Sequence, residues 1–340
     1  MEPPPVHYTR TPDGYDIAYT VSGEGLPLVL LPYIFNHVEL NWRHPAFRAL
    51  FEALSARFRL ILYDSRGQGM STRGLGLGHC LADYARDLDA VLEQVGVKQF
   101  VLMGRGAYGH IAVHFAAAHP DRVQALVLES CSVSIDSWPA ANTSLIPGHS
   151  WELILRGLVT SGPPNPWGDL MLQIAKEAVT QSDWEVRAQA FTGSSLEDVL
   201  HRLAVPTLVL HRRDFILVSA EEGMKLASRI PSSRLVMLAA PFPAEPEEAM
   251  RAIDDFLRDH AIAATTVDLQ GYEEALSRGL SSRETQVLRL VATGKSNRQI
   301  ADELVITLST VQHHVGSILG KTESANRTEA AAYAHRHGLV

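Results

Sequence analysis

The sequence predicts an α/β domain built on a doubly wound, mostly parallel sheet, followed by a smaller all-α domain. Short, nearly continuous apolar runs recur through the first 240 residues, as expected for strands that are buried on both faces. Segments with helical periodicity separate these runs, which is the alternation that a doubly wound sheet requires. Residues 276–340 show helical periodicity alone, and a chain of 340 residues is long enough for two domains.

The expected strands and helices of the first domain follow one another in a regular order. Residues 15–21 alternate between apolar and polar side chains, which is typical of a half-buried strand. Helical periodicity is found at 45–57 and 82–95, and a helix at 246–259 closes the domain. The six apolar runs that predict buried strands are 26–32, 58–64, 99–104, 123–130, 206–211 and 234–240. We therefore expect the first domain to span residues 1–260.

Residues 132–203 interrupt this order. They contain turns rich in Pro, Gly and Ser, helical patches and four of the five tryptophans, among them Trp151, Trp167 and Trp184. Such an insertion predicts a helical cap over one end of the sheet. Residues 261–275 have the composition of a linker, and residues 276–340 form the expected all-α domain.

Composition and charge limit the classes of function. Two cysteines without metal-ligand spacing predict neither a disulfide framework nor a metal site, and we expect no cofactor. The N-terminus lacks an apolar leader and no apolar run approaches 18 residues, so we expect a cytoplasmic protein without membrane contact. The chain carries 30 basic and 38 acidic residues, yet residues 276–340 carry eight basic and five acidic ones. A polyanion is therefore expected to bind the second domain only.

Residues 101–110, VLMGRGAYGH, have the pattern of a strand that turns sharply into a helix. Together with RLILYDSRGQGMS, FAAAHPDRVQALVLES and VPTLVLHRRD, in this order and spacing, this stretch resembles the α/β-hydrolase fold. In that family the turn has the pattern G-x-S-x-G, which aligns with residues 104–108 and puts Gly106 at the serine position. The resemblance places the acid at Asp214 and the histidine at Pro241.

This alignment predicts that the first domain is not an enzyme. Gly106 has no side chain that could attack a substrate, and no histidine occurs between His211 and His260. Ser130 and Cys131 are alternative nucleophiles, but the loop that holds the histidine in this family offers them no base. His110 and His114 lie one helical turn apart, so they are either metal ligands or ordinary packed or solvent-facing histidines. Tyr108 replaces the second glycine of the pattern, with a glycine only at 109.

A hydrolase corner that has lost its nucleophile predicts a small-molecule binding site. The loss of a serine side chain enlarges the cavity at the sheet edge, and the backbone N–H of Ala107 begins a helix that favours a ligand oxygen. We expect a neutral, largely apolar ligand with one or two oxygens, shielded by cap aromatics such as Trp138, Trp167 and Phe191. The predicted ligand-binding residues are Tyr33, Ile34, Arg105, Gly106, Ala107, Trp151, Asp214, Pro241 and Phe242.

Residues 280–340 predict two short helices, a tight turn at 306–307, a third helix with a polar face and a final helix. This stretch resembles the DNA-binding domain of LuxR-type transcription regulators over its whole length. The resemblance implies that the third helix enters the major groove. Gln312, His313 and Gly316 then face base edges. The residues expected near phosphates are Lys295, Ser296, Thr310, His314 and Lys321.

The sequence therefore predicts a DNA-binding transcription regulator whose degenerate hydrolase domain senses a small, largely apolar ligand. Its expected partners are double-stranded operator DNA, the ligand and a second copy of the chain, with RNA polymerase as a further candidate. Two alternatives remain open. In one the first domain is only a dimerisation or partner scaffold, and in the other it is an active hydrolase joined to a DNA-binding domain.

Overall fold

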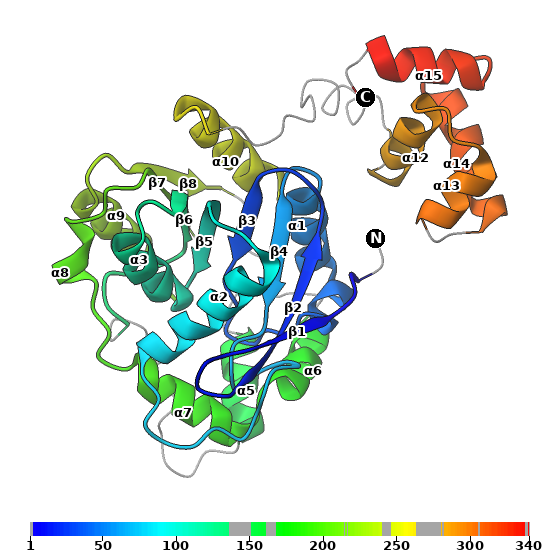
Figure 1. Cartoon of the computed structure of the whole chain (residues 1–340). Helices are drawn as coiled ribbons and strands as arrows, with labels where there is room; N and C mark the ends of the chain where they lie inside the picture. The colour runs from blue at the N-terminus through cyan, green and yellow to red at the C-terminus, as the bar shows by residue number, and fades with distance from the viewer. Residues whose placement is uncertain are drawn as a thin grey trace. The chain divides into compact units, whose positions relative to one another are not determined.

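The computed structural model divides the chain into two compact units, residues 1–264 and 265–340. The residues that the structure describes are 3–135, 151–160, 168–213, 215, 217–239, 246–262, 280, 282–304, 307–336 and 339. The expected linker, residues 261–275, lies largely outside them. Figure 1 shows the fold of each unit, and each is described by itself.

The first unit is built on an eight-stranded sheet in the order β1-β2-β4-β3-β5-β6-β7-β8. Strands β1 and β2, and β2 and β4, pair antiparallel, and all other neighbours pair parallel. The strands are β1 (His7–Arg10), β2 (Asp16–Ser22), β3 (Pro27–Leu30), β4 (Arg59–Tyr63), β5 (Phe100–Arg105), β6 (Val123–Glu129), β7 (Thr207–Arg212) and β8 (Arg234–Leu238). The predicted mostly parallel sheet is thus confirmed.

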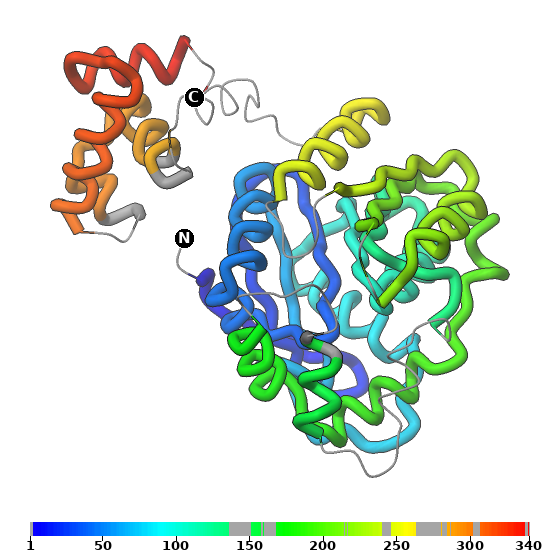
Figure 2. Tube along the Cα trace, turned by 180° about the vertical axis from the view of Figure 1, so that it is seen from behind, coloured from blue at the N-terminus to red at the C-terminus, as the bar shows by residue number. Residues whose placement is uncertain are grey.

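Helices cover both faces of this sheet, which explains why its strands read as continuous apolar runs. Helices α2 and α3 lie on one face, whereas α1 and α10 lie on the other, as the two opposite views show (Figures 1 and 2). In β5, Leu102 packs into the first of these layers and Val101 and Met103 into the second. The helices are α1 (Pro45–Ser55), α2 (Leu81–Val95), α3 (Tyr108–Ala118), α9 (Ala220–Arg229) and α10 (Glu247–Asp259), with a 3-10 helix η1 (Leu40–Arg43).

Part of the predicted cap is described as four helices. They are α5 (Trp151–Thr160), α6 (Gly168–Ala178), α7 (Gln181–Phe191) and α8 (Glu197–Leu200). Helices α5 and α6 share a small apolar core with Phe35, which follows β3, and include the buried Leu155 and Leu172. The cap is therefore joined to the sheet domain by apolar packing near the carboxyl end of β3.

The second unit is all-α, as predicted. Its helices are α12 (Ser282–Ala292), α13 (Asn297–Leu304), α14 (Leu308–Lys321) and α15 (Arg327–Arg336). Val287, Ile300, Val311 and Tyr333, one from each helix, meet in its core. Thr307 caps α14, because its hydroxyl accepts a hydrogen bond of 3.1 Å from the N–H of Thr310. Among the helices described here and in the first unit, none is long and apolar enough to cross a bilayer.

Candidate functional sites

The corner between β5 and α3 is a tight strand–turn–helix elbow with Gly106 at its apex. Gly106 has a φ of +54°, in the left-handed region, so the sharp turn predicted there is present. The strand and helix approach closely, because a Cβ on Gly104 would lie 2.8 Å from the Cβ of Ala112. A Cβ on Gly109 would overlap the sulfur of Cys131. The elbow thus keeps its compact geometry without any side chain at its apex.

Tyr108, which occupies the second glycine position of the elbow pattern, is buried and points to the loop after β4. Its hydroxyl lies 2.6 Å from Oγ of Ser65 and accepts a hydrogen bond of 3.1 Å from the side-chain amide of Gln68. The close helix–strand contact is made by Gly109 instead, one residue later. The bulky residue is accommodated because the glycine that the packing requires has shifted by one position.

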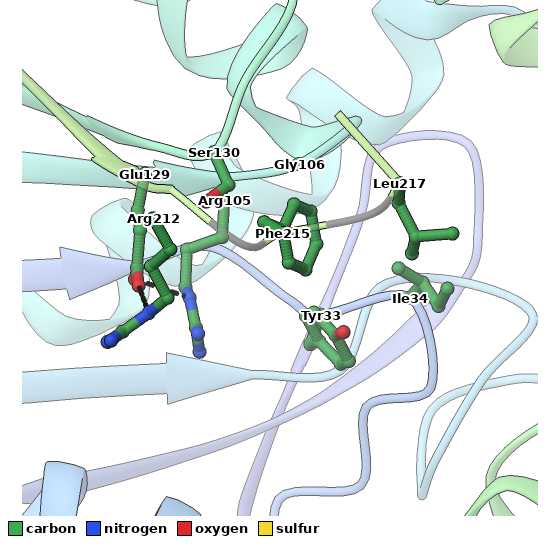
Figure 3. Close-up of a pocket in the computed structure, with 9 residues that line it drawn as sticks. All are labelled: Tyr33, Ile34, Arg105, Gly106, Glu129, Ser130, Arg212, Phe215 and Leu217. Carbon is green, nitrogen blue, oxygen red and sulfur yellow. Dashed lines mark hydrogen bonds and ion pairs between the residues drawn. The ribbon is translucent and has the colours of Figure 1, made fainter. Parts of the chain in front are cut away.

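A cavity opens beside the elbow, at the carboxyl ends of β3, β5, β6 and β7 (Figure 3). About 20 Å³ of it is open to the centre of a water molecule, so in this state it holds little more than one or two waters. Its lining residues are Tyr33, Ile34, Arg105, Gly106, Glu129, Ser130, Arg212, Phe215 and Leu217. The structure therefore brings together the predicted residues Tyr33, Ile34, Arg105 and Gly106.

A buried group of ions, which the sequence analysis missed, forms one wall of this cavity. Glu129 at the end of β6 bridges two arginines, with 2.8 Å to Nε of Arg105 and 3.2 Å to Nε of Arg212. Burial acts to raise the pKa of Glu129, but the two guanidinium groups outweigh this effect and lower it. The sequence contains one signal for the group, a charged residue at the end of each of three neighbouring strands. Arg105, a predicted ligand-binding residue, is thus an ion-pair partner of Glu129.

Ser130 and Cys131, the alternative nucleophiles, lie in different surroundings. Ser130 lines the cavity beside the elbow and has a φ of +51°. The sulfur of Cys131 lies 3.4 Å from the carbonyl oxygen of Glu129, and burial raises the pKa of this thiol. Cys131 is therefore a protonated core side chain, and no histidine lines the described cavity beside Ser130.

The structure places the remaining predicted residues of the first domain as follows. Ala107 is half-buried and packs against Ile135 and Val218, next to the cavity. Trp151 was expected at the ligand site, but it packs within the cap, 6.0 Å from the Trp184 ring, and is not among the described cavity-lining residues. Apolar packing between α5 and α7 outweighs exposure to the cavity. Asp214, Pro241 and Phe242 lie outside the described residues, as do Trp138 and Trp167.

The structure also places the histidine pair of α3 and the cap aromatic Phe191. His110 is a buried helix residue whose ring lies 2.7 Å from Oγ of Ser194, and burial lowers its pKa to about 4. His114, one turn later, is exposed, so the two histidines differ in burial. Phe191, a candidate cap aromatic, is buried and contacts Tyr84 and Tyr108.

In the second unit, helix α14 presents all three predicted base readers on one exposed face. Gln312, His313 and Gly316 are exposed, and His314 is half-buried beside His313. The hydroxyl of Thr310 lies 2.7 Å from that of Thr307, at the amino end of the helix. Ser296 caps α13 through a hydrogen bond of 3.3 Å from the N–H of Gln299 to its hydroxyl.

Lys321 has a structural role that the sequence analysis did not foresee. Its ammonium group lies 2.7 Å from Oε2 of Glu284, a buried carboxylate that also accepts a hydrogen bond from Ser317. This contact ties the end of α14 to α12. Lys321 is therefore an exposed side chain that links two helices of the domain, and its expected phosphate contact stays a prediction. Arg327 has a comparable role, donating to Oδ1 of Asn297 at 2.7 Å and to the carbonyl oxygen of Lys295.

The first unit has a strand–helix elbow on a mostly parallel sheet, and the second unit contains a helix-turn-helix. Together they define a hydrolase-fold protein with a DNA-binding domain. The family model described as alpha/beta hydrolase fold matches residues 27–234, and the chain belongs to this family. The model for bacterial regulatory proteins of the luxR family matches residues 278–334. The chain is accordingly a LuxR-family DNA-binding regulator with a hydrolase-fold domain.

Individual relatives resemble the two domains separately. A putative carbamate hydrolase, RutD of Azorhizobium caulinodans, is 27% identical over 240 residues, which are 65% of this chain and 85% of the relative. The transcriptional regulatory protein LiaR of Bacillus subtilis is 49% identical over 61 residues, 18% of this chain and 29% of LiaR. Among solved structures, the esterase RhEst1 from Rhodococcus matches with a TM-score of 0.63 and 26% identity, over 74% of this chain and 98% of the esterase. A hydrolase from Pseudomonas aeruginosa at 24% identity, with a TM-score of 0.65 over 74% of this chain and 98% of that one, shows the fold alone.

Proposed function

We propose that this protein is a ligand-responsive transcription regulator whose hydrolase-fold domain binds a small, largely apolar molecule without hydrolysing it. The observation that carries the proposal is the elbow. Its left-handed turn and close strand–helix packing are intact, yet Gly106 offers no nucleophile. The cavity beside it has apolar walls from Ile34, Phe215 and Leu217. Retained shape without a reactive group suits binding better than turnover.

If the first domain were only a dimerisation scaffold, the strained backbone of Ser130 would have no explanation. Ser130 is held in a left-handed conformation that costs on the order of 1–2 kcal/mol for a residue other than glycine. Strain of this kind persists where the surroundings fix it, and such residues gather at ligand sites. Ser130 lines the cavity and is adjacent in sequence to the buried Glu129. We therefore place the ligand at the elbow, with the second copy of the chain and RNA polymerase as partners of the DNA-bound form.

The first prediction concerns catalysis. The purified full chain is expected to hydrolyse 4-nitrophenyl acetate and butyrate no faster than heat-denatured protein, because the elbow lacks a nucleophile. Gly106→Ser is expected to remain inactive, since position 241 holds proline rather than a base. The measurement is release of 4-nitrophenolate. Turnover that copurifies with the wild-type chain through successive columns would show that the domain is an enzyme.

The second prediction concerns DNA recognition by the exposed face of α14. Binding sites selected from random duplexes with the full chain are expected to form an inverted repeat. Gln312→Ala should cost about 1–3 kcal/mol at the preferred sites and relax selection at one base pair of each half-site. Lys295→Ala should weaken all sequences about equally and make binding less dependent on salt. If both variants weaken binding uniformly, Gln312 does not contact a base.

A further inference from the structure

Helix α7 of the cap carries a buried arginine whose contacts are all with neutral groups. Arg187 is 5% exposed. Its guanidinium donates to the side-chain oxygen of Gln68 and, at 2.6 Å, to the carbonyl oxygen of Ile34. It also lies over the ring of Trp184, 5.0 Å from the centroid. In the described part of the chain, no carboxylate lies within ion-pair distance of Arg187.

A buried charge in such surroundings is costly. Removing an ion from water is offset in folded proteins by a counter-ion or by a full set of hydrogen bonds, and the desolvation cost is several kcal/mol at the least. Every other arginine in this domain with comparable burial has a carboxylate partner: Arg66 has Asp13 and Asp87, and Arg105 and Arg212 have Glu129. Arg187 therefore differs from them in having no carboxylate partner among the described residues, which leaves its charge available to an anion.

Two further hydrogen-bond donors near Arg187 have no acceptor among the residues that the structure describes. The hydroxyl of Tyr84 is buried without a hydrogen-bond partner, and so is Nε1 of Trp184. Phe191, one helical turn from Arg187, contacts Tyr84 with 5.4 Å between ring centroids. Burial raises the pKa of Tyr84, Arg187 opposes that rise, and Asp87, which is itself paired with Arg66, adds to it. A cation with no carboxylate within ion-pair distance among the described residues, beside two unsatisfied donors, matches the chemistry of a carboxylate or similar anion.

This polar cluster adjoins the cavity at the elbow. Ile34, whose carbonyl oxygen accepts the hydrogen bond from Arg187, also lines that cavity (Figure 3). We propose that Arg187 forms an anion subsite, so that the ligand has an apolar body at the elbow and a carboxylate-like group bound by Arg187 beneath the cap. The proposal rests on the proposed function and replaces the expected neutral ligand with a monoanionic amphiphile.

The experiment compares carboxylates with their neutral isosteres on the full chain. Phenylacetate, 4-phenylbutyrate and octanoate are titrated beside their methyl esters, by calorimetry and by the change in tryptophan fluorescence. The wild type is expected to bind the preferred carboxylate about ten- to a hundredfold more tightly than its ester, as a charge-assisted hydrogen bond provides. The fluorescence change should be lost in Trp184→Phe, because Trp184 is the tryptophan that Arg187 contacts.

Two variants separate binding from a structural role. Arg187→Gln should remove the preference for the carboxylate while keeping ester binding, whereas the exposed Arg202→Gln should change neither. If Arg187→Gln does not fold, the wild-type preference for carboxylate over ester, measured by thermal shift, still decides. Equal affinities for carboxylate and ester, no binding of any carboxylate at millimolar concentration, or an unchanged preference in a folded Arg187→Gln overturns the subsite.

A third variant distinguishes this inference from the proposed function. If Gly106→Leu abolishes binding of carboxylate and ester alike while the wild type does not prefer the carboxylate, only the anion subsite is wrong. If the preference depends on Arg187 but no binding depends on Gly106, the subsite is real and the elbow cavity is not the ligand site.

Discussion

Replacing Glu129 with alanine is expected to lower the free energy of unfolding of the hydrolase-fold domain by about 3–5 kcal/mol. The substitution breaks both ion pairs at once, with Arg105 and Arg212, and all three side chains are more than nine-tenths buried. Two guanidinium groups then remain near each other in a region of low dielectric constant. The measurement is urea denaturation of the full chain, followed by the fluorescence of the tryptophans in the first domain.

The control for this prediction is Glu197→Ala. Glu197 also pairs with an arginine, 2.6 Å from Arg229, but both side chains are exposed and water screens the charges. We expect no measurable change in the midpoint of denaturation. Glu129→Gln should fall between the two, because it retains the shape and some hydrogen bonds. A loss for Glu129→Ala as small as that of Glu197→Ala would mean that the buried ion group does not stabilise the fold.

The ion group also explains what holds the cavity wall in place. Arg105, Glu129 and Arg212 end three neighbouring parallel strands, and the register pairs Arg105 with Glu129 directly. The bridge between β5, β6 and β7 therefore fixes the strand ends from which the elbow and the loop after β7 begin. These two ion pairs hold this edge of the sheet together without any contact from a side chain at position 106.

The sheet was predictable because six of its strands are apolar along their length and a seventh, β2, alternates between apolar and polar side chains. Both faces are covered, and the pattern therefore does not depend on knowing which face is inward. Strand β1 was missed because His7–Arg10 is an exposed, polar edge strand, which hydrogen bonds to β2 place in the sheet. Local sequence alone contains little signal for such a strand.

The elbow could be predicted from the sequence, whereas the partners of the buried charged residues could not. The elbow follows from its glycines, since Gly104, Gly106 and Gly109 meet backbone and packing requirements that no other residue satisfies without strain. The partners of charged residues did not follow, because they come from other elements. Glu129 meets Arg212 from a strand 83 residues away, and Arg187 meets Gln68 across 119 residues. Such contacts are set by topology rather than by spacing along the chain.

Filling the apex of the elbow with Gly106→Leu is expected to abolish the response to ligand while the fold and basal DNA binding remain. An isobutyl side chain at this position would occupy a cavity that now holds little more than one or two waters, and ligand entry would be blocked. The response is measured with the ligand found by thermal-shift screening of the full chain, as the ligand-dependent change in affinity for the selected operator.

The control must reproduce the backbone cost, because Gly106 has a φ of +54° and any other residue is strained there. Gly106→Ala bears the same cost, on the order of 1–2 kcal/mol, but adds only a methyl group. The alanine variant should therefore be less stable than the wild type but still respond to the ligand. The leucine variant should fold with a similar loss of stability and should not respond to the ligand. Helix α14 belongs to the other compact unit, so basal operator binding should be alike in both variants and the wild type. A leucine variant that responds to the ligand like the alanine variant would place the sensor elsewhere, because volume at the elbow would then have no influence on it.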